Sequence, residues 1–254
     1  MKEATESMIR NREIKVALVC DWLTVFGGAE KVLWQFHRFF PKAPIFTTIW
    51  DDQKVKQFNT KIITSHLQNY PGAKNHHQWY IPLMPMAIER MNLRGYDLVI
   101  SSSSTVAKAV LTDPETIHIC YCHTPLRYAW QPYLDARGQG GFLKNCLLSY
   151  LRLWDRVTAD RVDYFLANSH YVASRIKKFY HHEAQVLYPP VDTNFYNIDT
   201  KTKKKNYFLF VARLIPYKKT DLLIEVFNEL GWPLKNCWQW ARKGEIRKAG
   251  KTKY

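Results

Sequence analysis

The chain has 254 residues, of which 46% are hydrophobic and 23% charged, with a formal net charge of +15. These values exclude a disordered or collagen-like chain and leave room for one α/β domain and part of another. The basic surplus favours anionic partners such as nucleic acid, acidic lipid or phosphorylated small molecules. There is no apolar run of transmembrane length and no secretion signal, so a cytoplasmic protein is expected.

Short apolar runs alternate with helical periodicities over residues 14–188. We expect strands in 14–20, 43–50, 60–67, 96–104, 116–122, 164–169 and 184–192. Helices are expected after Gly28 and in 73–93, 140–163 and 170–180. Pro82 and Pro85 should break the second helix, and Ser169 should cap the last. This alternation predicts an α/β fold with a doubly wound, Rossmann-like parallel sheet covered on both faces.

A second, incomplete domain is predicted after an exposed linker at 189–206, which is rich in turn residues and contains "KTKKK". Residues 207–235 supply one strand in "NYFLFVARL" and one helix in "TDLLIEVFNEL", with Thr220 or Asp221 as its cap. One strand and one helix cannot bury their own apolar faces, so we expect this domain to be unfinished.

Three stretches fall where strands of such a sheet end, which is where parallel sheets bind ligands. Gly27 and Gly28 in "FGGAEK" could let backbone N–H groups approach an anion, or could form a tight turn. His123 in "CYCHTPLRYAW" could orient a polar substrate or transfer a proton, with Arg127 and Tyr128 nearby, or could bond to backbone. Arg213 and Lys218 in "ARLIPYKK" could hold a diphosphate, or could lie in a solvated basic turn.

Several other features are expected to be structural. Cys120 and Cys122 form a C-x-C pair, but no second pair follows at zinc-site spacing, so neither metal nor cofactor is expected. The serine run 101–104 is predicted to be a loop and helix cap. A last group of apolar side chains suits a core or an interfacial face: Leu147, Leu148, Leu151 and Trp154.

The stretches "GGAEKVL", "YDLVISSSS", "CHTPLRYAW", "ANSHYVASRI", "VLYPPVDTNFY" and "FVARLIPYKKTDLLIEVFNEL" occur in this order over residues 14–235. Together they resemble the retaining glycosyltransferases of family 4, which have the two-domain GT-B fold. Within that family the chain is most similar to bacterial mannosyltransferases that build O-antigen and exopolysaccharide.

The resemblance implies transfer of a hexosyl group, with mannose as the expected sugar, from a nucleotide-sugar to a lipid-linked or polysaccharide acceptor. It implies no metal. Arg213 and Lys218 match the diphosphate-binding pair, Gly27 and Gly28 match the donor-phosphate loop, and His123 matches the residue beside the reacting carbon. The basic surface would suit peripheral contact with the inner face of an anionic membrane.

The tail at 236–254 lacks the glycine-rich motif resembling "IVGxGP" and the E-x(7)-E signature that the family carries. Read one base out of frame, the codons of Asn236 to Ala241 can encode Ile-Val-Gly-Asn-Gly-Pro. We therefore expect an off-frame tail, a truncated second domain and negligible transferase activity of this chain alone. The gene sequence across codons 230–240 tests the frameshift.

Two alternatives stay open at this level. The chain could be a non-catalytic basic module that binds acidic membrane or nucleic acid, although no nucleic-acid motif occurs and no nucleic-acid partner is expected. It could also be a gene remnant that does not accumulate. Salt-dependent DNA binding and immunoblotting of the native host separate these readings.

Overall fold

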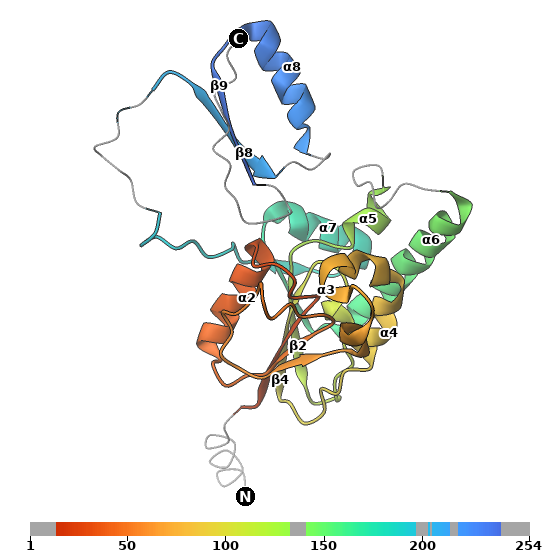
Figure 1. Ribbon diagram of the computed structural model, residues 1–254. Coiled ribbons are helices and arrows are strands. Elements are labelled where there is room, and N and C mark those ends of the chain that lie inside the picture. The colour runs from red at the N-terminus through yellow and green to blue at the C-terminus, as the bar shows by residue number, and fades with distance from the viewer. Residues whose placement is uncertain (1–13, 133–140, 197–202, 204, 214–217, 240–254) are drawn as a thin grey trace, which may run out of the picture.

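A computed structural model describes residues 14–132, 141–196, 203, 205–213 and 218–239 (Figure 1). Its main element is a seven-stranded sheet with the order β3-β2-β1-β4-β5-β6-β7, in which every neighbouring pair is parallel. The strands are β1 (Val16–Cys20), β2 (Ile45–Thr47), β3 (Ile62–Thr64), β4 (Leu98–Ser103), β5 (Ile117–Cys122), β6 (Tyr164–Ala167) and β7 (Ala184–Val186). The predicted Rossmann-like parallel sheet is confirmed.

Helices connect these strands. They are α2 (Gly28–Phe39), η1 (His66–Asn69), α3 (Ala73–His76), η2 (His77–Leu83), α4 (Met84–Glu89), η3 (Ala107–Ala109), α5 (Arg127–Trp130), α6 (Phe142–Val157), η6 (Thr158–Arg161) and α7 (His170–Tyr180). Figure 1 shows α2 on one side of the sheet and α4 and α6 on the other. The sheet is therefore covered on both faces, as the continuous apolar strands predicted.

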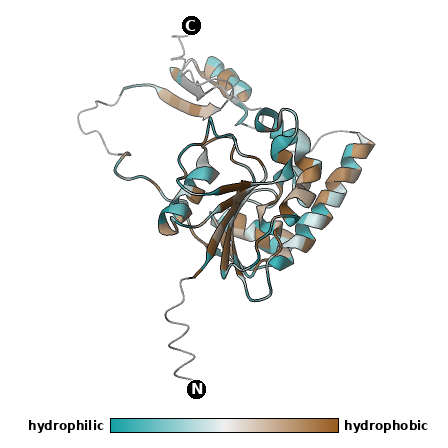
Figure 2. Ribbon diagram, turned by 60° about the horizontal axis from the view of Figure 1, so that its bottom comes forward, coloured by the Kyte–Doolittle hydropathy of each residue, from teal (hydrophilic) through white to brown (hydrophobic). Residues whose placement is uncertain are grey.

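The core forms because alternate residues of each strand point to opposite faces. Val16, Leu18 and Cys20 of β1 join the cluster that contains Leu33 of α2. Ala17 and Val19 of the same strand join the cluster that contains residues of α4 and α6. Figure 2 shows the strands as the most apolar part of the fold. Burial of these strands fixes the positions of the loops that follow them.

Several predicted boundaries agree with the structure, whereas β2, β3 and β7 are shorter than the strands expected at 43–50, 60–67 and 184–192. The helix expected at 73–93 is broken, but α3 already ends at His76, before Pro82. Pro82 lies inside the 3-10 helix η2, and Pro85 lies in the first turn of α4. Ser169 caps α7, with its Oγ accepting from the Val172 N–H at 3.3 Å. The helix expected at 140–163 ends as α-helix at Val157 and continues as the 3-10 helix η6.

Two local predictions are wrong. Ser101–Ser103 belong to β4 rather than to a loop, because their backbone continues the parallel pairing with β5 and all three residues are buried. Neither Thr220 nor Asp221 caps the helix α8 (Thr220–Leu230). Its cap is Lys219, in the left-handed region at φ 50°, and no cap side chain bonds to the helix.

A separate two-stranded sheet contains β8 (Phe208–Arg213) and β9 (Leu234–Gln239), which are parallel and connected through α8. The strand β9 was not predicted, and the expected boundary between 235 and 236 falls inside it. Residues 240–254 lie outside the described part of the chain. In β8, Leu209 and Val211 stay exposed, as expected for a unit this small.

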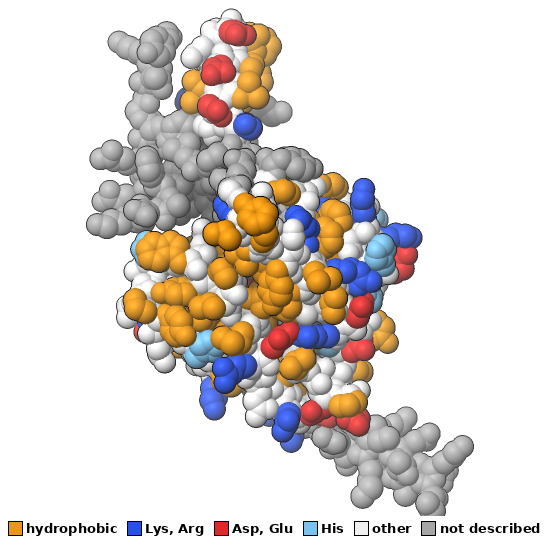
Figure 3. Space-filling view, turned by 90° about the vertical axis from the view of Figure 1, so that its right-hand side faces the viewer, with side chains coloured by type: hydrophobic (Ala, Val, Ile, Leu, Met, Phe, Trp, Pro, Cys, Tyr) orange, Lys and Arg blue, Asp and Glu red, His pale blue; other side chains and the backbone are white. Residues whose placement is uncertain are grey.

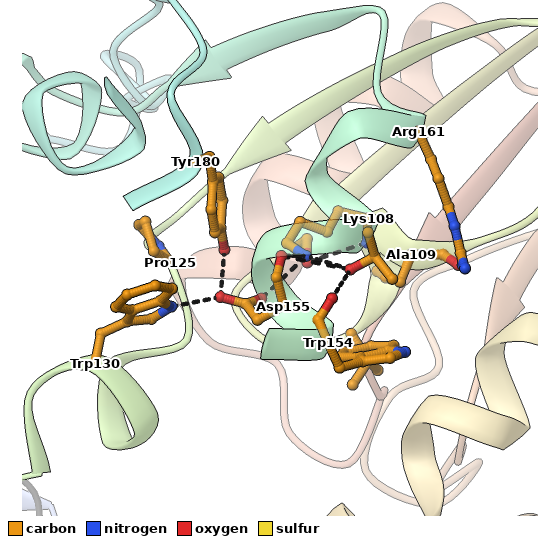
Figure 4. Close-up of polar contacts among 12 residues, drawn as sticks. Lys108, Ala109, Pro125, Trp130, Trp154, Asp155, Arg161 and Tyr180 are labelled. Atoms are coloured by element: carbon orange, nitrogen blue, oxygen red, sulfur yellow. Dashed lines mark hydrogen bonds and ion pairs between the residues drawn. The ribbon is translucent and has the colours of Figure 1, made fainter. Parts of the chain in front are cut away.

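A buried ion pair connects several elements of the first domain (Figure 4). Lys108 Nζ of η3 lies 3.0 Å from Asp155 Oδ1 of α6, and both side chains are at most 1% exposed. Asp155 Oδ2 accepts from Trp130 Nε1 at 2.7 Å and from the Tyr180 hydroxyl at 2.9 Å. The Lys108 ammonium also donates to the Thr158 hydroxyl at 2.9 Å. Because Trp130 follows the His123 loop, this network fixes where that loop ends.

Candidate functional site

The candidate site lies where the strand order reverses. The chain runs from β1 outward to β2 and β3, then returns to place β4 on the other side of β1. The loops after β1 and β4 therefore diverge and leave a crevice at the carboxyl ends of these strands. A small cavity of about 30 Å³ lies there, lined by Cys20, Asp21, Trp22, Ala29, Glu30, Leu33, Ser102 and Ser104.

His123 lies at this edge of the sheet, directly after β5. Its Nε2 is 2.9 Å from the Ser102 hydroxyl at the end of β4. Its backbone is fixed as well, since its N–H donates to the Ser103 carbonyl at 2.8 Å and its carbonyl accepts from Asn168 at 3.0 Å. The His123 ring packs edge-on against Tyr121, with centroids 5.2 Å apart. The imidazole thus has a defined position beside Ser102, which lines the cavity.

Burial lowers the pKa of the His123 imidazole, and the nearby Asp21 carboxylate offsets part of this effect. The ring is therefore neutral at pH 7. Nε2 is bonded to Ser102, and the hydrogen bonds among the described residues include none to Nδ1. A neutral imidazole with one nitrogen engaged can use the other to donate or accept a hydrogen bond to a ligand.

Asp21 holds the loop after β4 in place. Its carboxylate accepts from the N–H groups of Val106 and Ala107 at 2.7 Å, and from the N–H and hydroxyl of Ser104 at 2.7 and 2.8 Å. A longer bond of 3.4 Å comes from Ser103. Sequence reasoning missed Asp21 and the serines, although an acidic residue directly after a buried strand was a usable signal.

The two glycines begin α2. Gly27 precedes the helix, and its N–H donates to Glu30 Oε2 at 2.8 Å. A Cβ at Gly27 would lie 3.2 Å from that carboxylate oxygen, whereas a Cβ at Gly28 would meet no heavy atom within 4 Å. The Gly27 N–H is therefore occupied by Glu30. Donation from Gly27 to a phosphate needs Glu30 to move away, and the phosphate role of both glycines stays a prediction.

Arg127 and Tyr128 lie in α5, close after His123. Arg127 is partly exposed, whereas Tyr128 is 4% exposed and packs in the core. A second arginine, which sequence reasoning missed, contacts the loop that follows His123. Arg175 of α7 is 7% exposed and donates to the Thr124 hydroxyl and to the Pro125 carbonyl. Burial lowers the pKa of its guanidinium. Of the two predicted contacts, Arg127 is the better placed to reach a ligand.

Arg213 and Lys218 lie at one end of the second unit. Arg213 is the last residue of β8, and Lys218 is an exposed residue two positions before α8. The carboxyl end of a strand and the N-terminus of the next helix meet at the same edge of a parallel unit. The backbone thus brings the two positions together. The Arg213 side chain and residues 214–217 lie outside the described part, so diphosphate binding stays a prediction.

Within the described ranges, no group of three or more His, Cys, Asp and Glu side chains could hold a metal ion. Cys120 and Cys122 are buried in the core, and burial raises the pKa of the Cys120 thiol to about 12. They therefore pack as small apolar side chains. Among the helices that the structure describes, none is both long and apolar enough to cross a membrane.

Comparison with known proteins agrees with this geometry. The model of Glycosyltransferase Family 4 matches residues 26–195, which is more than half of the chain. No curated protein matches. The crystal structure of HepE from Anabaena in complex with UDP is similar, with a TM-score of 0.51 and 16% identity over 85% of this chain and 58% of that chain. The complex of HepE with UDP-glucose gives a TM-score of 0.52 and 15% identity, over 93% and 63% of the two chains.

At this identity the likeness to HepE shows the fold alone, and the chain spans about three fifths of the length of the solved structures that it matches. The fold is that of a GT-B glycosyltransferase: a Rossmann-like parallel sheet followed by a smaller second sheet. The family assignment rests on the sequence match, whose residues include the glycine loop, Ser102 and His123. The chain belongs to glycosyltransferase family 4.

Proposed function

We propose that the protein is a glycosyltransferase for transfer of a hexosyl group, with mannose as the expected sugar, from a nucleoside-diphosphate sugar to an acceptor hydroxyl, with retention at the reacting carbon. The negligible transferase activity of this chain alone stays a prediction. The single observation that carries this proposal is the His123 imidazole, held by Ser102 at the carboxyl edge of the sheet in a family 4 chain. HepE, which has a similar fold, was crystallised with UDP and with UDP-glucose.

In this reaction the bond between the sugar's anomeric carbon and the diphosphate oxygen breaks. A bond forms from that carbon to the acceptor oxygen, and the acceptor's proton leaves with the diphosphate. Negative charge therefore builds up on the departing phosphate. Arg213 and Lys218 would neutralise it without a metal, because cations placed where charge develops lower the barrier.

The residues of the first domain would act on the sugar. Neutral His123 would bond a sugar hydroxyl through Nδ1, and Arg127 would add a cation beside the loop. Tyr128 would contribute mainly by holding α5, since its ring is buried. Gly28 at the start of α2 would allow close approach of the phosphate, and Glu30 would have to release the Gly27 N–H before that group could donate.

The acceptor we propose is lipid-linked or a polysaccharide, and the protein would work in the cytoplasm at the inner face of the membrane. The net charge of +15 supports contact with anionic partners of this kind. Nucleic acid is a weaker candidate because the sequence carries no recognisable nucleic-acid motif.

Calorimetric titration of the purified 254-residue chain with uridine, guanosine, adenosine, cytidine and thymidine diphosphates tests the proposal. Arg213→Ala and Lys218→Ala should each weaken binding of the preferred nucleotide by about tenfold or more, since each removes a charge-assisted hydrogen bond. Lys205→Ala is the matched control, because it removes the same charge from an exposed position outside the proposed site.

Selective binding that depends on Arg213 and Lys218 but not on Lys205 supports the proposal. Failure to bind any of the five diphosphates, or equal losses in all three variants, contradicts it. Equal losses would mean that net charge alone attracts the nucleotide.

A further inference from the structure

Arg175 of α7 is a buried cation without an acidic partner in the described part of the chain. Figure 3 shows Lys and Arg side chains spread over the surface of the molecule, whereas the Arg175 side chain is 7% exposed. The ion pairs between described residues include none to Arg175. Burial of a cation without a carboxylate is unfavourable, and an unbranched apolar side chain would fill a similar space without that cost. Packing alone therefore does not explain an arginine at this position.

The guanidinium bonds to the two residues that directly follow His123. Arg175 Nη1 donates to the Thr124 hydroxyl, and Nη2 donates to the Pro125 carbonyl at 3.4 Å. Because the guanidinium is planar, its donors have a fixed geometry relative to one another. The His123 carbonyl is held as well, since it accepts from Asn168 Nδ2 at 3.0 Å. Residues 123–125 are thus fixed by side chains from α7 and from the residue before its cap.

The same side of α7 also contacts the far end of this segment. Tyr171, Arg175 and Phe179 are spaced by four residues, which puts them on one side of the helix. The Arg175 guanidinium carbon lies 5.9 Å from the Tyr171 ring centroid and 5.6 Å from that of Phe179. The Phe179 ring stacks on Trp130, the last residue of α5, with centroids 4.6 Å apart. These rings stabilise the buried cation, and α7 becomes a support along which residues 123–130 lie.

This support affects the candidate site through the backbone. The His123 imidazole bonds to Ser102 on β4 through Nε2, at 2.9 Å. The hydrogen bonds of Arg175 go to Thr124 and Pro125, and none goes to the imidazole. The ring can keep its bond to β4 and its direction only while the backbone of residues 123–125 stays in place. Arg175 therefore acts on the imidazole through the loop and not by touching it.

We infer that Arg175 is a positioning residue, which holds the His123 imidazole in the orientation that contacts the donor sugar by fixing Thr124 and Pro125. The inference rests on the proposed function for the role of His123, and deepens it by naming the residue that orients this group. The orientation of the ring can be measured without any nucleotide, so the two proposals can fail separately.

Two variants remove the contact from its two sides. Arg175→Met keeps an unbranched side chain and loses both hydrogen bonds, whereas Thr124→Val keeps nearly the same volume and loses the hydroxyl that accepts from Arg175. The matched control is Arg161→Met. Arg161 donates to the Ala109 carbonyl and to Glu89 Oε1, both at 2.7 Å, and makes no printed contact with the His123 loop. Thermal unfolding shows which variants are folded.

The first measurement is the ¹⁵N chemical shift of the His123 ring nitrogens in the protein without ligand. The second is calorimetric binding of UDP-glucose compared with UDP, and of GDP-mannose compared with GDP. The ratio of the two affinities isolates the sugar, because both members of each pair carry the same nucleoside diphosphate. A loss of stability by itself changes neither the tautomer of His123 in the folded protein nor this ratio.

We expect Arg175→Met and Thr124→Val to move the His123 ring shifts toward the averaged values of an unconstrained histidine. Both variants should lower the affinity for the nucleotide-sugar relative to the free diphosphate by about tenfold, the effect of one hydrogen bond to the sugar. Affinity for the free diphosphate should change little. Arg161→Met should leave the ring shifts and the affinity ratio as they are in the wild type.

Unchanged His123 shifts in Arg175→Met and Thr124→Val would overturn the inference. Equal changes in Arg161→Met would also overturn it, because they would reflect a general loosening of the fold. Loss of diphosphate binding in Arg175→Met with unchanged ring shifts would mean that the guanidinium binds the ligand itself. If Arg175→Met does not fold, Thr124→Val decides. If the wild type binds none of these nucleotides, the proposed function is contradicted, and the ring shifts still decide on Arg175.

Discussion

The Ser102 hydroxyl and His123 Nε2 lie 2.9 Å apart, at the carboxyl ends of two neighbouring strands. The bond pairs side chains from β4 and β5, whose register puts Ser102 beside Tyr121 and Ser103 beside Cys122. Ser102 therefore fixes the orientation of the imidazole and decides which ring nitrogen remains for a ligand.

Replacing Ser102 by Ala should free the His123 ring and weaken nucleotide-sugar binding by about tenfold, the effect of one buried hydrogen bond. The tautomer of His123, read from ¹⁵N chemical shifts, should change in the same variant. Ser174→Ala is the control, because the Ser174 hydroxyl bonds to the backbone of α7 at an exposed position. An unchanged His123 spectrum in Ser102→Ala would contradict this role for the serine.

Replacing Asp21 by Asn should destabilise the domain by about 2 kcal/mol or more, because an amide group would face several N–H donors. Urea unfolding at neutral pH measures the loss. Asp192→Asn is the control. Asp192 accepts from the Asn194 and Phe195 N–H groups at an exposed turn, so its replacement should have a much smaller effect. Equal losses in the two variants would mean that Asp21 has no special part in holding the loop after β4.

Removing one partner of the buried Lys108–Asp155 pair should be strongly destabilising. Asp155→Leu should reduce the free energy of unfolding by about 3–5 kcal/mol, because it leaves the Lys108 ammonium buried without its counter-charge. The double variant Lys108→Met/Asp155→Leu should be less destabilised than the sum of the single variants. Urea unfolding of the four proteins gives the coupling energy, and strictly additive losses would contradict the pairing.

Stability should fall as pH drops below about 6.5, because of His118. Burial lowers the pKa of this histidine from 6.5 to about 4, the Asp163 carboxylate opposes the shift and Lys108 adds to it. Between these values the unfolded chain binds a proton that the folded chain does not, so the free energy of unfolding decreases as pH falls. The effect is about 3 kcal/mol at most and is complete near pH 4.

The measurement compares urea unfolding at pH 7 and pH 4.5 for the wild type and for His118→Gln. For each protein the free energy of unfolding at pH 4.5 is compared with its own value at pH 7. A loss of stability that the substitution causes equally at both pH values therefore cancels. Burial also lowers the pKa values of His37 and His123, which gives the variant a residual slope of the same sign. If the two proteins lose equal free energy between these pH values, His118 is not the source.

The sequence by itself determined the parallel sheet, most helix boundaries and the loop that carries His123. It could do so because strands buried on both faces read as continuous apolar runs, and because Pro82, Pro85 and Ser169 act on their own neighbours in the chain. Family resemblance added roles for Arg213, Lys218 and the two glycines, and these roles remain predictions. The family itself is confirmed by the match over residues 26–195.

Only the tertiary structure decided which side chains meet. Asp21 and Ser104 are 83 residues apart, and Lys108 and Asp155 are brought together by the packing of η3 against α6 and η6. No local periodicity encodes such contacts. The same is true of the engagement of Gly27 by Glu30, the burial of Tyr128 and the strand β9. Each depends on how elements pack, because hydrogen bonding and burial are properties of neighbours in space rather than in sequence.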